Sequence, residues 1–416
     1  TAIMSKKWWQ FWKKDATYNT LRLLVAQTGG NFTAYNFAVF VEEGYQRNPT
    51  VYACVQEYVK AVHACPIIIK RKDGSTMPLG ANKSLSKLLN QPNNTQSLAQ
   101  FLEQAVIYYL ISGEAPIYGD SVIPNRLPQE LWVLRPDWLT AIESQNQFAK
   151  VEKWMYTASN GEASQYDIPP SNMFMWCAQN PLNTYRGQSP LLPAAYAVDQ
   201  LNAYAHSNKK LLDNDMQPAG SLSTDANLDE SAFERMREQF GAEYAGVNNQ
   251  RKPLILEGGL KWTPFSFTMR DAEFIQGKVS AKRDICEALD VPSQLLGLDG
   301  SQTYANYEQA RASFYEDSVI PLYNNLLSGL SKWLLWRAGL SPDDIMCVDI
   351  DAVAALEPRR AERNTKLDTM QSISTNEKRQ AMGYESVEGG DVLLVNSGLI
   401  PLEMAGADIP NLNPMF

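Results

Sequence analysis

Two long helical segments in the middle of the chain enclose a short module with a different pattern. The first follows Ser189-Pro190, with Ser189 as its N-cap, and continues to about residue 215, which is roughly 39 Å at 1.5 Å per residue. The second runs over 270–289. The predicted elements of the module are strands at 220–223, 254–256 and 262–267 and a helix over 230–240. This order predicts a hairpin of two helices that carries a small α/β module at its tip.

A third and longer helical segment follows this hairpin. After Val291-Pro292, the residues 297–303 form a loop bounded by glycine, and helical spacing then extends over 304–338. Pro321 lies inside this segment. Proline donates no backbone hydrogen bond and its ring crowds the carbonyl near Asp317, so we expect the helix to kink there.

The regions on either side mix helices with short strands, so the predicted fold class is α+β. Asn48-Pro49-Thr50 starts a helix with Thr50 as its N-cap, and a second helix over 95–111 ends at Gly113. The predicted strands are 67–71, 115–118, 131–134, 149–156 and 173–176. The C-terminal region has a strand near 347–350, a basic helix over 359–370 and a capping box at 374–377, and is mainly helical.

The first 44 residues differ from the rest of the chain. Two lysine pairs, at 6–7 and 13–14, flank the aromatic side chains Trp8, Trp9, Phe11 and Trp12. One interpretation is a flexible terminal arm whose aromatics dock on the same or a neighbouring subunit. The other is an anchor at a membrane surface or on a partner, since aromatics between lysines suit the headgroup region. No apolar run approaches the roughly 20 residues of a membrane-spanning helix.

The charge balance argues against a protein that grips nucleic acid. The chain has 37 basic and 46 acidic side chains and a formal charge of −9. The acidic excess lies mainly after residue 339, where thirteen acids face six bases. A sequence-reading DNA binder is therefore not expected.

Recognisable catalytic and cofactor motifs are missing from the sequence. There is no GxxxxGK[ST] string, and the two histidines, His63 and His206, lie in predicted helices and are taken as structural or solvent-facing. The five cysteines are too widely spaced for a zinc site, and no disulfide is expected. Four carboxylates could in principle bind magnesium, although solvation at a helix start and a strand end accounts for them: Asp343, Asp344, Asp349 and Asp351. The sequence predicts a protein with no cofactor, no metal and no enzymatic activity.

The order of several short segments resembles that of portal proteins of tailed bacteriophages, the head–tail connector ring family, in its siphovirus-type branch. These segments are Asn48-Pro49-x-Val51-x-x-Cys54-Val55, Leu88-Leu89-Asn90-Gln91-Pro92-Asn93, Gly113-Glu114-Ala115, Leu131-x-x-Leu134-x-Pro136, Gly187-Gln188-Ser189-Pro190-Leu191, Asp290-Val291-Pro292-Ser293-Gln294-Leu295-Leu296-Gly297, Asn306-Tyr307-Glu308, Ile320-Pro321-Leu322 and Ser374-Thr375-Asn376-Glu377-Lys378-Arg379. Each segment alone is unspecific, but together they extend from residue 48 to about 400.

The resemblance implies a dodecameric ring at one capsid vertex, through which double-stranded DNA passes without sequence-specific contacts. It divides the chain into an N-terminal arm (1–44), wing (45–188), stem helix (189–215), clip (216–268), second stem helix (269–290), a region with the tunnel loop, long kinked helix and return to the wing (291–350), and crown (351–416). The implied location is the virion, and the host cytoplasm during assembly. The implied partners are the terminase large subunit, the major capsid or scaffold protein and a head–tail adaptor.

Two groups of residues would then meet other molecules. The tunnel loop, facing DNA, would consist of Leu298, Asp299, Gly300, Ser301, Gln302 and Thr303. The clip residues that would contact terminase and adaptor are Glu230, Glu234, Arg235, Arg237 and Glu238. An acidic or neutral channel suits this function, because it avoids tight binding of phosphates and lets the duplex slide.

Two other functions are compatible with parts of the sequence. One is a metal-dependent DNA-processing enzyme, such as a nuclease, that uses the four aspartates named above. The other is a membrane-associated assembly factor that acts through the aromatic arm.

Overall fold

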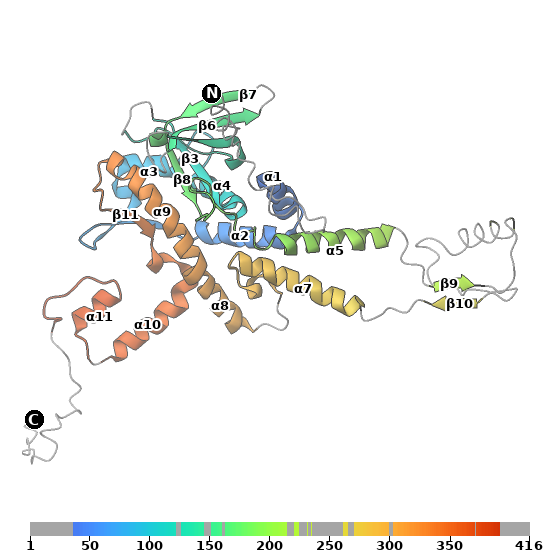
Figure 1. Cartoon of the computed structure of the whole chain (residues 1–416). Coiled ribbons are helices and arrows are strands. Elements are labelled where there is room, and N and C mark those ends of the chain that lie inside the picture. Colours follow the sequence, from blue (N-terminus) through green and yellow to red (C-terminus); the bar gives the residue numbers. More distant parts are fainter. Residues whose placement is uncertain are drawn as a thin grey trace, which may run out of the picture. The chain divides into compact units, whose positions relative to one another are not determined.

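The computed structural model describes residues 36–121, 126–144, 151–159, 163–213, 220–223, 231, 234, 261–264, 270–298, 303–370 and 372–391. The chain divides into two compact units, with the boundary between Val348 and Asp349. Each unit is described by itself. Helices and small antiparallel sheets occur together, which confirms the α+β class (Figure 1).

The centre of the first unit is built on helix α2 (Pro49–His63), which packs against α4 (Leu98–Ser112). The apolar side chains predicted to share one face of α2 are all buried: Val51, Cys54, Val55, Tyr58, Val59 and Val62. The N-cap of α2 is Asn48 and not Thr50, because the Asn48 side chain accepts from the backbone N–H groups of Thr50 and Val51, and Pro49 occupies the first turn. Gly113 ends α4 with a φ of 78°, as predicted.

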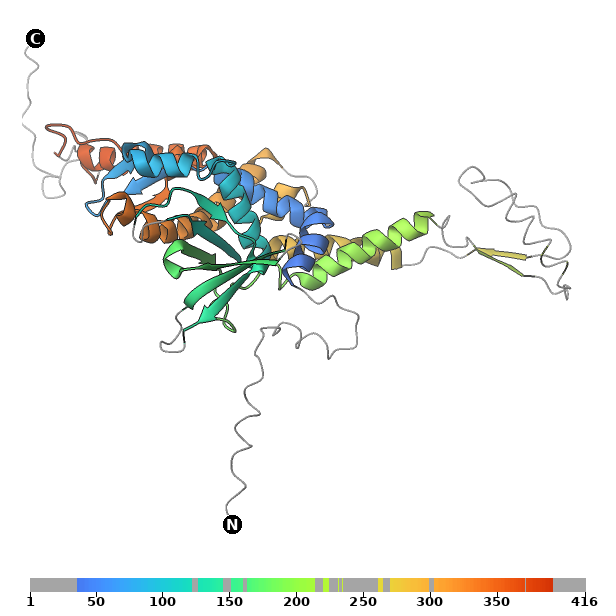
Figure 2. The same ribbon diagram turned by 90° about the horizontal axis from the view of Figure 1, so that it is seen from above.

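Three small antiparallel sheets surround these helices (Figure 2). The first has the order β11-β1-β2 and joins Ile345–Val348 to Ile67–Lys70 and Thr76–Pro78. The second, β4-β3-β8, joins Leu131–Val133, Glu114–Gly119 and Met173–Cys177. The third, β5-β6-β7, joins Leu139–Glu143, Val151–Ser159 and Ala163–Ile168, and its core contains Leu139, Trp154, Ile168 and Met173.

Short helices are also part of this unit. Helix α1 (Phe37–Val39) continues into a π-helix over Phe40–Gln46, and α3 (Lys83–Asn90) lies between β2 and α4 in the chain. Three strands differ from the sequence prediction. The strand expected near 347–350 spans Ile345–Val348, and strands β5 and β7 were not predicted at all.

The two long helices of the predicted hairpin, α5 (Ala195–Asp213) and α7 (Arg270–Ala288), lie side by side (Figure 1). Helix α5 begins at Ala195, five residues after Pro190. The stretch before it forms single turns, with Ala194 N–H bonded to Leu191 O, because Pro193 lacks an N–H and disfavours helical backbone at Leu192. Between α5 and α7 in the chain, β9 (Gly220–Ser223) pairs with β10 (Lys261–Pro264). The predicted strand at 254–256 lies outside the described residues, as does the 230–240 helix apart from Ser231 and Glu234, which are helical.

The predicted 304–338 helix consists of four consecutive helical elements. They are α8 (Tyr304–Ser313), a π-helix (Phe314–Val319), α9 (Ile320–Leu334) and a 3₁₀ helix (Trp336–Ala338), and Gly339 ends the segment with a φ of 79°. The buried face of α9 packs against β11 and includes Tyr323, Leu326, Leu327, Leu330 and Leu334.

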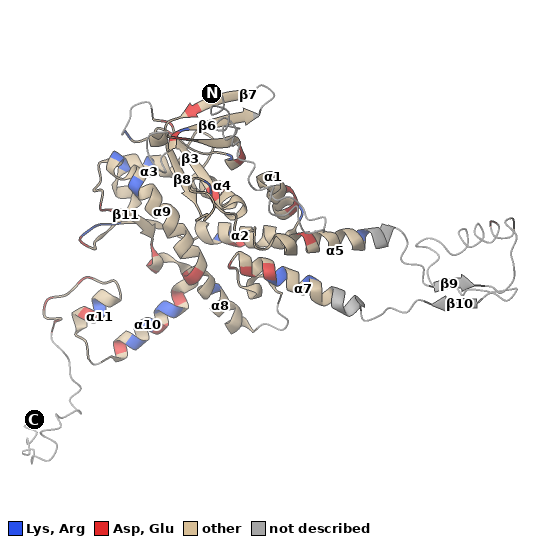
Figure 3. Cartoon of the chain, viewed as in Figure 1, with Lys and Arg blue, Asp and Glu red and all other residues tan. Residues whose placement is uncertain are grey.

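The second unit is described as far as Asp391 and contains helices α10 (Glu357–Thr369) and α11 (Thr375–Ala381). Acidic and basic side chains follow one another along α10 (Figure 3). Glu357 pairs with Arg360, and Glu362 lies 2.7 Å from Lys366. The predicted capping box opens α11, where Ser374 and Glu377 exchange hydrogen bonds.

Candidate functional site

The chain turns at Asp290, two residues after the end of α7 and seven before Gly297. We call this turn the loop base, because the connection from α7 through the 297–303 loop to α8 begins there. Asp290 has a φ of 53°, in the left-handed region that aspartate tolerates better than most residues. The Val291 N–H donates to Cys286 O at 2.8 Å, and the Tyr58 hydroxyl donates to Leu289 O at 2.9 Å. The end of α7 is therefore held by its own last turn and by helix α2.

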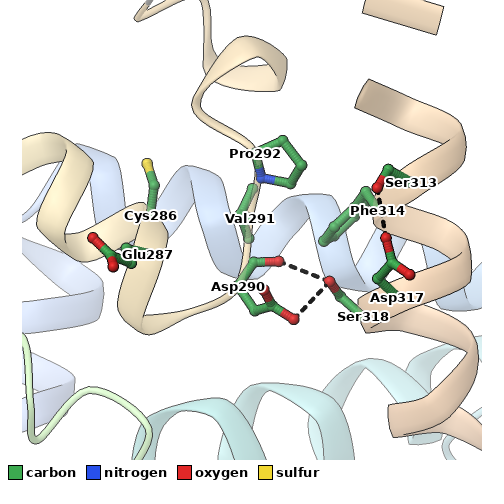
Figure 4. Close-up of a pocket in the computed structure, with 9 residues that line it drawn as sticks. All are labelled: Cys286, Glu287, Asp290, Val291, Pro292, Ser313, Phe314, Asp317 and Ser318. Carbon is green, nitrogen blue, oxygen red and sulfur yellow. Dashed lines mark hydrogen bonds between the residues drawn. The ribbon is translucent and has the colours of Figure 1, made fainter. Parts of the chain in front are cut away.

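Ser318 closes this turn from the opposite helical segment (Figure 4). Its Oγ lies 2.9 Å from both the carbonyl oxygen and the Oδ2 atom of Asp290. One hydroxyl proton is shared between these two acceptors. Ser318 belongs to the π-helix, so the π-helix and the end of α7 are directly linked at the base of the loop.

A pocket of about 210 Å³ lies beside this link (Figure 4). Its lining includes the carboxylates of Glu287, Asp290 and Asp317, and Phe314 supplies an apolar wall. Ser313 Oγ donates to Asp317 Oδ2 at 2.5 Å. The phenyl ring of Phe314 packs edge-on against Tyr58, with centroids 4.9 Å apart. Burial raises the pKa of the Tyr58 phenol, so this hydroxyl remains a donor to Leu289 O.

Replacing Ser318 with alanine is expected to destabilise the loop base by about 1 kcal/mol, because the Asp290 acceptors lose their donor. Amide hydrogen exchange over 286–298 should become faster in this variant. The matched control is Ser313→Ala in the preceding turn. Among the described residues, the Ser313 hydroxyl donates to the exposed Asp317 carboxylate and makes no bond to the loop base. Equal exchange in the two variants would mean that the Ser318–Asp290 bond does not hold the loop base.

The π-helix directly precedes Pro321, which lies in the first turn of α9. In the last π turn the Ile320 N–H bonds to Tyr315 O, five residues earlier. The wider turn accommodates a proline that can donate no hydrogen bond. The structure thus shows a change of helical register before Pro321, while the expected kink stays a prediction.

A second site fixes the backbone before α5, at a buried ion pair. The Glu114 side chain is 4% exposed, and Arg186 donates to both of its carboxylate oxygens, at 3.0 Å from Nε to Oε2. The Gly187 N–H donates to Glu114 Oε2 at 3.0 Å. Arg186 also donates to Leu139 O at 2.7 Å and Pro136 O at 2.9 Å. This single guanidinium joins β3, the start of β5 and the segment that leads to α5.

The segment that contains Gly187 lies directly against the end of α4. A Cβ on Gly113 would come within 2.0 Å of Gln188 O, and a Cβ on Gly187 within 2.0 Å of Gly113 O. Ser189 Oγ donates to Ile111 O at 2.6 Å and accepts from the Leu191 N–H at 3.1 Å. Ser189 therefore caps the turn that leads to α5 and does not cap α5 itself.

Most of the predicted contact residues lie outside the described residues. Of the predicted tunnel loop, Leu298 and Thr303 are described, and Thr303 caps α8 by accepting from the Asn306 N–H; Asp299, Gly300, Ser301 and Gln302 are not described. Of the clip residues only Glu234 is described, and Glu230, Arg235, Arg237 and Glu238 are not. The aromatic side chains of the arm, Trp8, Trp9, Phe11 and Trp12, also lie outside the described residues.

Three of the four aspartates considered for magnesium have other side-chain contacts. Asp343 pairs with Lys72 at 2.8 Å, Asp344 accepts from the Ser341 N–H at 3.2 Å, and Asp351 lies 3.7 Å from Arg363. Across the described residues, no three His, Cys, Asp or Glu side chains are grouped so that they could hold a metal ion. In the same part of the chain, no helix combines the length and hydropathy needed to cross a membrane.

Comparison with known proteins identifies the family. The family model described as "Phage portal protein" matches residues 49–383. The chain belongs to the phage portal protein family. This confirms the resemblance found in the sequence. The Asp290–Ser318 hydrogen bond and the Glu114–Arg186 ion pair both lie within the matched region.

Relatives match over most of the chain. A protein of Rickettsia bellii (strain RML369-C), described as an "Uncharacterized protein", is 30% identical over 402 residues, which cover 94% of this chain and all of the relative. The portal protein of Escherichia phage T5 is 27% identical over 332 residues, 78% of this chain and 76% of the T5 protein. A chain in the neck of a native GTA particle, computed with C12 symmetry, is 27% identical with a TM-score of 0.68, and covers 86% of this chain and 96% of its own.

Proposed function

We propose that twelve copies of this portal-family chain form a ring around a channel for double-stranded DNA at one vertex of a virus-like particle. The observation that carries the proposal is the similarity to the neck chain computed with C12 symmetry, which covers 86% of this chain. The relative from Escherichia phage T5, which is described as a portal protein, supports the same proposal. The ring would serve genome packaging and ejection, and its location would be the virion, with assembly in the host cytoplasm.

In this ring the loop over 298–303 would be the tunnel loop. Both ends of this loop are joined to helical turns. Gly297, with a φ of 66°, ends the 3₁₀ turn before the loop, and Thr303 caps α8 after it. The Ser318–Asp290 link then sets the direction in which the chain leaves α7. A loop held rigidly at both ends suits a ring of contacts that checks the slippage of DNA without binding it tightly.

The remaining contacts belong to the same proposal. The module between α5 and α7 would be the clip, which binds the terminase large subunit during packaging and a head–tail adaptor afterwards. Its side chains Glu230, Glu234, Arg235, Arg237 and Glu238 would form a polar contact surface of the kind that successive partners require. The capsid or scaffold protein would meet the outside of the ring.

Electron cryo-microscopy of the purified chain tests this proposal. We expect a hollow ring with twelvefold symmetry, in which the 298–303 segments form the narrowest part of the channel. A monomer at micromolar concentration would contradict the ring. A ring whose 298–303 segments lie far from the axis would contradict the tunnel loop alone. A nuclease assay with magnesium and plasmid DNA, run on the same preparation, is expected to show no cleavage.

A further inference from the structure

Lys and Arg residues lie in α3 and at the C-terminal end of α9, which a hydrogen bond from Asn82 to Ala338 brings close together (Figure 3). Lys83 and Lys87 are one turn apart and exposed on α3, and Lys332 is exposed near the end of α9. Trp336 and Arg337 follow in the 3₁₀ helix. We call these residues and one further indole the α3–α9 patch: Lys83, Lys87, Lys332, Trp333, Trp336 and Arg337.

Hydrogen bonds hold the two parts of the patch together. The side-chain amide of Asn82, the N-cap of α3, donates to Ala338 O at 3.1 Å. The indole N–H of Trp333 and the Nη2 of Arg337 both donate to Ser171 O, at 3.0 and 2.8 Å. The start of α3 and the 3₁₀ helix after α9 are therefore joined directly, and the Trp333 and Arg337 side chains have fixed positions within the patch.

The cationic side chains of this patch make no ion pair within the described residues. The Arg337 guanidinium lies between two indoles, 5.5 Å from the Trp333 ring and 5.2 Å from the Trp336 ring, and its Nε and Nη1 have no hydrogen-bond partner there. Burial lowers the pKa of Arg337, as expected for a cation without a nearby anion. In the same part of the chain the three lysines make no ion pair, whereas Lys60, Lys72 and Lys153 each pair with a carboxylate at 2.7–2.8 Å.

We propose that the α3–α9 patch binds an acidic segment of another protein on the outside of the ring. This rests on the proposed function, in which the loop before Tyr304 faces the channel. The helical segment over 304–338 spans at most about 50 Å at 1.5 Å per residue, and the patch is at its far end. Trp336 is 40% exposed and lies beside Arg337. Tryptophan and arginine are the residue types enriched in the hot spots of protein–protein interfaces. A carboxylate-bearing partner supplies the missing negative charge.

Nucleic acid fits this surface less well. Single-stranded binding sites stack bases on free aromatic faces, and duplex binding requires a longer run of cations. Trp333 is not free for stacking, because its ring packs against Phe174 with centroids 6.1 Å apart and lies close to Gly119. Trp336 is left as the single large exposed indole among the patch residues. An acidic polypeptide needs only spaced carboxylates, which match the spacing of Lys83 and Lys87 along α3.

The test measures binding of a fluorescein-labelled octaglutamate peptide to the purified full-length chain by fluorescence anisotropy at low salt. We expect Lys83→Glu/Lys87→Glu to weaken binding by about tenfold or more, and Trp336→Ala to weaken it by a smaller factor. The matched control is Lys278→Glu/Lys282→Glu on α7, which makes the same charge change at the same spacing and should alter binding less than about twofold. All four substituted lysines are outside the buried core, and ring formation is checked for each variant by electron microscopy.

Three results would overturn the proposal. The first is that the peptide does not bind the wild-type chain, and the second is that the two double variants weaken peptide binding equally. The third is that a 20-base-pair DNA duplex displaces the peptide at a lower concentration than unlabelled peptide does, and that Lys83→Glu/Lys87→Glu no longer binds this duplex. The last result would assign the patch to nucleic acid. Failure of the wild-type chain to form a ring would instead contradict the proposed function, so the two failures are distinguishable.

Discussion

Replacing Arg186 with alanine should lower the free energy of unfolding by about 3 kcal/mol, because it leaves the Glu114 carboxylate buried without its cation. The Glu114 side chain is 4% exposed, and the backbone N–H of Gly187 would be the remaining donor to its carboxylate among the described contacts. Two backbone carbonyls, of Leu139 and Pro136, would lose their donor as well. The value is at the low end for buried pairs because the Arg186 side chain is 33% exposed.

Urea unfolding, followed by tryptophan fluorescence at one protein concentration for all variants, gives the measurement. The control is a double-mutant cycle with Glu114→Ala and the double variant Glu114→Ala/Arg186→Ala. The double variant should lose less free energy of unfolding than the sum of the losses in the two single variants, since it buries no unpaired charge. An Arg186→Ala variant as stable as the wild type would show that the pair does not hold the segment before α5.

Local patterns in the sequence predicted several of the helices. The apolar spacing of α2 predicted six side chains that are buried, and Ser374 with Glu377 predicted the start of α11. Gly113 predicted the end of α4. These features depend on residues within one or two turns of each other, so they are visible without knowledge of the tertiary structure.

Features that depend on distant residues were missed. Among the described residues, strands β5 and β7 pair only with β6, and their short sequences have no distinctive alternation. Glu114 lies in an apolar strand, which indicates that a buried partner is needed, yet nothing in the sequence selects Arg186, 72 positions later. Ser189-Pro190 has the residues of a helix start, but Pro193 disfavours helical backbone at Leu192, so α5 begins later than the sequence predicts.

The candidate channel site was predicted only in part. Gly297 and Thr303 mark the ends of the loop in the sequence through their preferences for a helix C-terminus and an N-cap. Pro321 predicted a disturbance of the long helix, but not that a π-helix would precede it. Ser318 reaches Asp290 across 28 positions, and a serine on a helix gives no signal of such a contact.

Gly187→Ala should prevent the correct packing of the segment before α5 and destabilise the chain by about 3 kcal/mol, the upper end of the range for overpacking. The new Cβ would lie 2.0 Å from Gly113 O and 2.6 Å from Gly113 C, so backbone and not a flexible side chain would have to move. Moving Gly113 would also disturb its carbonyl, which accepts from the Ala178 N–H at 2.7 Å, and its positive φ at the end of α4.

Gly80→Ala is the matched control for this substitution, because the same methyl group would meet no atom of the described residues within 4 Å there. Its free energy of unfolding should stay within about 0.5 kcal/mol of the wild type. Urea unfolding and the yield of rings in electron micrographs would be measured for both variants. Gly187→Ala should lose both stability and ring yield, since the start of α5 would be displaced; a variant that unfolds like Gly80→Ala would show that the Gly113–Gly187 contact is not required for the fold.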